Sequence, residues 1–245
     1  MTILQSILPA AEAFSEGSLE MPVSAPVIDA SPTLAWSDLT INSILVIAAV
    51  VLFLLHIRSF MHILPSLLDC LSRWKGCVKI DASIKLSHER DISTLVFLLP
   101  FCLVIDRYDI AKPSFIAGWP DVWQAPAMIG FIVAWIIVRR LCYGLCSLKA
   151  QRLETFRTAR NCTMDFFIPT TILMLICVGI CGLIGCNDGT IRYILDYLCA
   201  FQYLVMLVRK SQILRSFCNP FKTFLYLCAL EFVPTGILIS AVVLS

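Results

Sequence analysis

The chain has 245 residues, of which 59% are hydrophobic, and its mean hydropathy is +0.85. Soluble domains average about 45–50% apolar residues, so this excess excludes an ordinary soluble domain and indicates helices that face lipid. The net charge is only +2, and Lys and Arg do not form the single basic face typical of a nucleic-acid-binding protein. We therefore expect the lipid bilayer as a partner and no nucleic acid.

The first 36 residues form an acidic tail that contains no Lys or Arg. The tail is rich in Pro, Ser, Ala and Glu, a composition that does not fold by itself. It lacks the basic start of a signal peptide. We interpret Glu12, Glu16 and Glu20 as candidate contacts with a partner protein, and residues 37–245 as a membrane domain.

Six apolar segments follow, which predict an all-α integral membrane protein with six transmembrane helices. The segments are 39–57, 92–105, 125–138, 166–186, 191–208 and 224–244. A spanning helix needs about 20 apolar residues, so the second and third segments are short. They form either two full crossings or a re-entrant hairpin. We favour two crossings, because a hairpin would bury the charges of Asp106 and Arg107 at its tip.

The sidedness of these segments is predicted by the distribution of Lys and Arg. The loops after the first, third and fifth segments, with their flanks, hold 16 of the 19 basic residues, and the other loops hold 3. Cytoplasmic loops are enriched in Lys and Arg. Both termini are therefore predicted to lie outside the cytoplasm, an N-out/C-out topology.

The longest basic loop, 58–91, contains two patterns. Its first part has apolar residues at helical spacing around Pro65, which predicts an amphipathic helix on the inner leaflet. Residues 78–87 alternate between apolar and polar, which favours a strand that needs a partner. An irregular segment sunk into the headgroups is an equal alternative. Val78, Ile80 and Ile84 are candidate partner contacts.

The twelve cysteines include no CxxC pair, and several lie inside apolar runs. We expect them to be unbridged and structural. No protease, P-loop, nucleophile-elbow or dinucleotide-binding motif occurs, so we expect no enzyme, no catalytic residue, no cofactor and no metal. Asp165 stands at the start of the fourth segment, where a carboxylate caps a helix.

Charged residues inside apolar segments are candidates for function because they are costly in lipid. Asp196 lies in the fifth segment, one turn after Arg192, and Glu231 lies in the sixth. Opposite helix directions predict that the two carboxylates differ in depth by about 5–8 Å. They could share a polar pocket with Arg107, either as a proton or cation pathway or as a clamp that fixes helix packing.

Three stretches resemble an uncharacterised family of polytopic inner-membrane proteins from Bacteroidota, known only as a domain of unknown function. These stretches are Arg73-Trp74-Lys75, Leu98 to Arg107, and Phe224 to Pro234. The resemblance covers roughly residues 40 to 245 and excludes the acidic tail. It implies a Gram-negative inner membrane, and it supplies no activity and no catalytic residues.

Two function classes remain from the sequence. The first is a non-enzymatic inner-membrane subunit or accessory factor of a larger envelope assembly, with protein export or envelope biogenesis as its expected setting. Only analogy with other proteins of the same class supports that setting. The alternative is a small transporter or proton/cation-conducting protein that uses Asp196 and Glu231. A lipid-modifying enzyme is disfavoured by the missing motifs.

Overall fold

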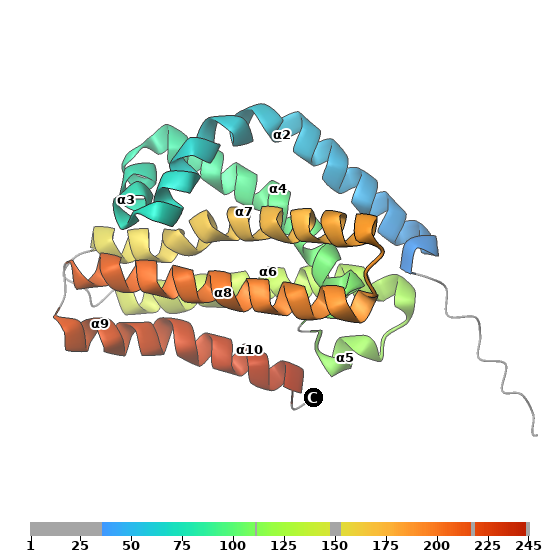
Figure 1. The fold of residues 1–245 in the computed structure, drawn as a ribbon. Helices are drawn as coiled ribbons and strands as arrows, with labels where there is room; N and C mark the ends of the chain where they lie inside the picture. The colour runs from blue at the N-terminus through green and yellow to red at the C-terminus, as the bar shows by residue number, and fades with distance from the viewer. Residues whose placement is uncertain (1–35, 111, 148–152, 217–218, 244–245) are drawn as a thin grey trace, which may run out of the picture. The chain divides into compact units, whose positions relative to one another are not determined.

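The computed structural model describes residues 36–110, 112–147, 153–216 and 219–243 (Figure 1). The chain divides into two units, 1–35 and 36–245. Glu12, Glu16 and Glu20 therefore lie outside the described residues. The described part contains helices and no strand. In order these are η1 (Trp36–Asp38), α2 (Thr40–Ser72), α3 (Trp74–Ala82), α4 (Ile84–Arg107), α5 (Ser114–Ala117), α6 (Asp121–Ser147), α7 (Leu153–Ile184), α8 (Asp188–Arg215), α9 (Pro220–Leu227), η2 (Cys228–Phe232) and α10 (Val233–Val243).

Among the described residues, five helical stretches are long and apolar enough to cross a bilayer, which indicates a multi-pass membrane protein. They are Thr40–Ser72, Asp121–Gly144, Arg157–Ile184, Asp188–Arg215 and Pro220–Ser240. The predicted second segment is not among them, because α4 has only 14 uncharged residues between Asp91 and Asp106. Its 24 residues nevertheless extend about 36 Å, and α4 runs along the bundle rather than turning back within it (Figure 1).

A tight turn pairs α7 with α8 along their length. Gly185 has a φ of +75°, a conformation that glycine adopts without strain. The Cys186 N–H donates to the Cys181 carbonyl over 3.0 Å, and the Gly185 N–H donates to the Gly182 carbonyl over 3.2 Å. This is the Schellman pattern that ends a helix. The turn places the start of α7 beside the end of α8.

The structure corrects the prediction for 58–91. This segment is helical except at Arg73 and Ser83, so it contains neither a strand nor an irregular run. The helix predicted around Pro65 is not separate from the first span, because α2 continues through Pro65 to Ser72. Leu67 is buried in the core beside Ile63, whereas Leu68 is 56% exposed. The buried side of α2 packs against α4 and α7.

The structure also corrects the expectation of unbridged cysteines, because Cys70 and Cys77 form a disulfide with their Cα atoms 4.9 Å apart. Residues seven apart in one straight helix would be separated by about 10 Å, so the spacing of these two cysteines in the sequence did not predict a disulfide. An extended Arg73 ends α2 and turns α3 back against it. A Cβ on Gly76 would lie 2.5 Å from the backbone nitrogen of Cys70, so the close approach needs glycine.

Replacing Gly76 with Ala is expected to lower the free energy of unfolding by about 1–3 kcal/mol, the usual cost of overpacking. Backbone atoms surround the new methyl group, so the start of α3 must move. Unfolding in detergent, followed by circular dichroism, measures the loss. Gly179→Ala is the matched control, since a Cβ there meets nothing within 4 Å. Equal stability of the two variants would contradict the close approach.

Candidate functional site

Glu231 lies in η2, a single π-helical turn. The Val233 N–H donates to the Cys228 carbonyl, five residues back. Pro234 follows directly and cannot donate to the carbonyl four residues before it, so the helix loses its regular bond at this point. Such π turns often occur at functional sites. This turn points the Glu231 side chain into the bundle, where only 1% of the residue is exposed.

Three side chains from two other helices donate to the Glu231 carboxylate. Arg139 of α6 pairs with one oxygen, and Tyr143 of α6 and Lys210 of α8 share the other. Lys210 also donates to the Tyr143 hydroxyl over 3.2 Å and to the Thr163 hydroxyl of α7. We name these five residues the Glu231 cluster. It ties η2 to three long helices.

A second polar group surrounds Arg90, which is 2% exposed. One of its nitrogens donates to Asp81 over 2.6 Å and lies 3.6 Å from an Asp165 oxygen. The Asn161 amide donates to the same Asp81 oxygen over 2.9 Å. We name Asp81, Arg90, Asn161 and Asp165 the Arg90 cluster. A guanidinium stays protonated in proteins, and the carboxylates of Asp81 and Asp165 beside it offset the cost of burying its charge, so Arg90 is a cation.

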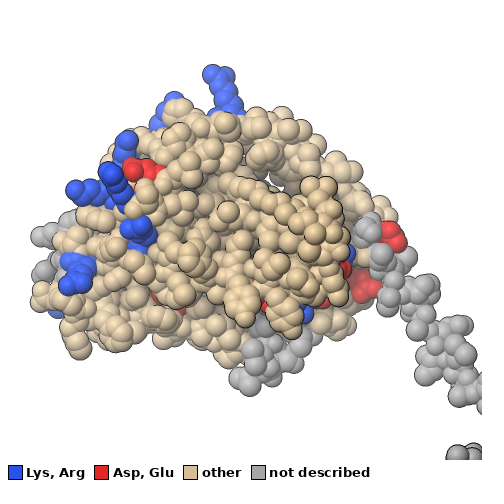
Figure 2. Space-filling view, in the orientation of Figure 1, with Lys and Arg blue, Asp and Glu red and all other residues tan. Residues whose placement is uncertain are grey.

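The two clusters meet across α7, which contributes Asn161, Thr163 and Asp165. Together they contain three carboxylates and three cations, all inside the bundle. They lie toward the end of the bundle that holds α3, where Lys and Arg gather on the surface (Figure 2). Each charge already contacts an opposite charge. The arrangement is therefore suited to fixing helices in register rather than to exchanging a ligand.

The structure does not bring Asp196 to Glu231. The Tyr203 hydroxyl donates to the Glu231 backbone carbonyl over 3.5 Å, and Asp196 lies seven residues earlier on α8, about 10 Å along the axis. Asp196 and Arg192 are both exposed. Neither side chain makes a hydrogen bond or ion pair with any residue that the structure describes. The predicted shared pocket is therefore wrong, and Arg192 does not pair with Asp196 although it lies one turn before it.

Arg107 lies at the opposite end of the bundle from Glu231. Its guanidinium is 3.2 Å from Asp188 at the start of α8, about 33 Å along that helix from Lys210. It also lies over the rings of Trp36 and Tyr108, with centroid distances of 5.9 and 5.6 Å. Arg107 thus belongs to a separate site.

The sequence interpretation missed most of the clustered residues. Arg139 and Lys210 were counted among the flanking basic residues, and Asp165 was expected to cap a helix. In the structure α7 begins at Leu153, so Asp165 lies twelve residues inside it and is 2% exposed. One signal in the sequence could have identified the clusters: acidic and basic residues lie at about the same predicted membrane depth in several helices.

The predicted partner contacts of the 78–84 region have different environments. Ile80 is fully buried in the core, so it cannot contact another protein, and that expectation is wrong. Val78 is 36% exposed and Ile84 is 90% exposed. Of the three predicted contacts, only Val78 and Ile84 lie at the surface, where a partner protein can reach them.

One group of side chains has the composition of a metal site. The sulfurs of Cys70 and Cys77 and a carboxylate oxygen of Asp165 lie within 4.8 Å of one another. The two sulfurs are joined in a disulfide, whereas metals bind the thiolate form. The Arg90 cation also lies beside Asp165. These residues do not fit a metal ion in this state.

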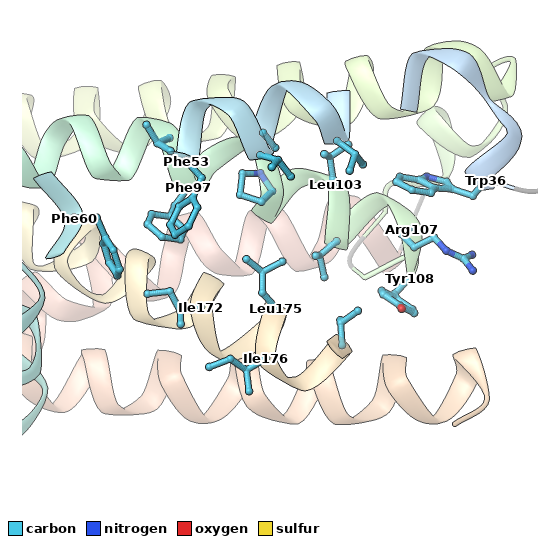
Figure 3. A pocket seen from close by; sticks show the side chains of 17 residues that line it. Trp36, Phe53, Phe60, Phe97, Leu103, Arg107, Tyr108, Ile172, Leu175 and Ile176 are labelled. Atoms are coloured by element: carbon cyan, nitrogen blue, oxygen red, sulfur yellow. The ribbon is translucent and has the colours of Figure 1, made fainter. Parts of the chain in front are cut away.

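An apolar groove of about 470 Å³ lies between α2, α4 and α7 (Figure 3). Trp36, Arg107 and Tyr108 stand together at one end. Three aromatic rings close the other end: Phe60 lies 5.2 Å from Phe97 and 6.1 Å from Phe53, between ring centroids. Arg107 is the only charged side chain among the described lining residues.

Comparison with known protein families, curated proteins and solved structures finds no match for this chain. The resemblance to the Bacteroidota family therefore receives no support from these comparisons. The candidate sites depend on their geometry alone.

Proposed function

We propose that this protein is a non-enzymatic subunit or accessory factor of a larger assembly in a bacterial inner membrane. The observation that carries the proposal is the exposed Asp196 on α8. A carboxylate that faces lipid without a partner is costly. Arg192, Tyr193 and Tyr197 surround it on the exposed side, with Tyr193 68% and Tyr197 77% exposed. A membrane helix of another protein that carries a hydrogen-bond donor or a cation would satisfy this surface.

The proposed topology has six crossings with both termini outside the cytoplasm, α4 being the second. The directions of the helices and the position of the basic residues support this topology. The ends of α2, α6 and α8 and the starts of α4, α7 and α9 lie at one end of the bundle (Figure 1), where the basic residues gather. Positive charge marks the cytoplasmic side. Protein export or envelope biogenesis is the proposed setting.

A photo-cross-linking residue at Tyr197 tests the partner directly in living cells. We expect cross-linking to one discrete protein. Asp196→Leu should abolish this product, because the partner helix would lose the carboxylate with which it pairs. The matched control is the same residue at Leu55 on α2, which is 72% exposed. The proposal fails if Tyr197 yields no protein product, or if Tyr197 and Leu55 yield the same products.

The alternative, a proton or cation conductor, requires a route that includes both Asp196 and Glu231. The structure separates these carboxylates, and the donors around Glu231 hold it in place. That alternative expects Glu231→Gln to abolish ion flux in proteoliposomes while the fold stays intact. The clamp expects the same substitution to destabilise the fold. The geometry favours the second outcome.

A further inference from the structure

The groove between α2, α4 and α7 has the dimensions of one lipid chain. From Phe97 at its closed end to Arg107 at its open end, α4 rises about 15 Å. This is about half of a hydrocarbon core of roughly 30 Å, so the groove covers the depth of one leaflet. Its volume of about 470 Å³ is within the usual range for a small-molecule site, about 300–1,000 Å³.

The groove is accessible from the surface that faces lipid. Val50 of α2 is 52% exposed and Ile176 of α7 is 51% exposed, and both line it. A chain could therefore enter sideways from the bilayer, without passing through water. Within the groove it would contact aliphatic and aromatic side chains, and each buried methylene contributes about 0.8 kcal/mol.

In the proposed topology, the open end of the groove lies at headgroup level. Trp36 and Tyr108 lie there, and Trp119 and Trp123 are exposed at the same end of the bundle. Trp and Tyr concentrate where the bilayer meets water. The Arg107 guanidinium lies between the rings of Trp36 and Tyr108. Its ion pair with Asp188 is exposed, with side chains 40% and 61% accessible, and exposed pairs contribute little.

We propose that this groove binds one acyl chain of an anionic phospholipid whose phosphate pairs with Arg107. The apolar walls hold the chain, the three phenylalanine rings limit its depth, and the guanidinium selects negative charge. Arginine suits this role because its planar group forms paired bonds to phosphate oxygens. The site is independent of the proposed assembly partner, which contacts α8 instead.

Native mass spectrometry of the full chain tests the proposal, with phosphatidylglycerol and phosphatidylcholine of identical acyl chains as probes. Val50→Trp fills the groove and is expected to weaken phosphatidylglycerol binding about tenfold, the loss of about two buried methylenes. Val51→Trp is the matched control, since Val51 is 48% exposed but does not line the groove. It should bind as the parent does.

Arg107→Gln is expected to reduce the preference for phosphatidylglycerol about fivefold, the value of one basic residue near a charged lipid surface. Phosphatidylcholine binding should fall less, because its choline cation offsets the charge of the phosphate that both lipids carry. Arg192→Gln is the matched control, because Arg192 is exposed and does not line the groove. Equal binding of both lipids by the parent chain would overturn the role of Arg107.

Two further results would overturn the groove itself. One is unchanged lipid binding by Val50→Trp, and the other is an equal loss in Val50→Trp and Val51→Trp, which would indicate general surface lipid. Circular dichroism checks that each variant folds. If Val50→Trp does not fold, Ile176→Trp blocks the same groove from α7 and the same criteria apply.

Discussion

Replacing Glu231 with Gln is expected to lower the free energy of unfolding by about 3–5 kcal/mol, the usual cost of breaking a buried ion pair from one side. The variant leaves Lys210, which is fully buried, and Arg139, which is 15% exposed, without their carboxylate. Gln keeps only one acceptor oxygen, so Tyr143 and the two cations would compete for it. Detergent-solubilised protein, unfolded by increasing sodium dodecyl sulfate and followed by circular dichroism, provides the measurement.

Asp196→Asn is the matched control for Glu231→Gln. Both positions lie in apolar segments, but Asp196 is exposed and without a hydrogen bond or ion pair among the described residues. Its replacement should change stability by less than about 0.5 kcal/mol, as is usual at surfaces. Equal losses at the two positions would contradict the distinction between a buried clamp and an exposed contact.

A compensating variant separates the charge from the volume of Glu231. Glu231→Gln combined with Lys210→Met removes one charge of each sign and keeps long side chains. Buried ion pairs are often replaced by apolar residues at little cost, so the double variant should be more stable than Glu231→Gln alone. If the double variant is less stable by the sum of both single effects, Lys210 and Glu231 do not interact.

The helical, lipid-facing character of the chain could be predicted because composition and long apolar runs determine it. The end of α2 could not, because Pro65 usually breaks a helix yet lies inside this one. The alternation of residues 78–87 was likewise misleading. Ile80 is buried against the bundle and Ile84 begins a new helix, so tertiary contacts overrode the local strand pattern.

The candidate site was predicted only in part for a similar reason. Glu231 was identified because a carboxylate in an apolar segment is conspicuous. Its partners were not, since the charge rule treats Arg139 and Lys210 as flanking residues. A long lysine side chain reaches toward the start of its own helix, so Lys210 contacts Glu231 from the end of α8. Asp196 was placed by its depth along the helix axis, and depth does not determine which face of the helix a residue occupies.

Arg90→Gln is the second substitution with a large expected effect, about 3–5 kcal/mol of lost stability. It would leave Asp81 and Asp165, whose side chains are 8% and 1% exposed, facing each other without the guanidinium that bridges α3, α4 and α7. The same detergent unfolding experiment measures the loss. Arg58→Gln is the matched control, since Arg58 is exposed on α2 and should change stability by less than about 0.5 kcal/mol.

A double-mutant cycle shows whether Arg90 acts through Asp165. Arg90→Gln with Asp165→Asn removes the cation and one of the carboxylates that it neutralises, so repulsion between Asp81 and Asp165 disappears. We expect a coupling free energy of about 0.5–3 kcal/mol, with the double variant more stable than the sum of the single losses predicts. Additive losses would mean that Arg90 acts through Asp81, Ser87 and Asp91 and not through Asp165. In that case the Arg90 cluster would hold α3 against α4 without reaching α7 through Asp165, and the Glu231 cluster would be the main polar tie between α7 and its neighbours.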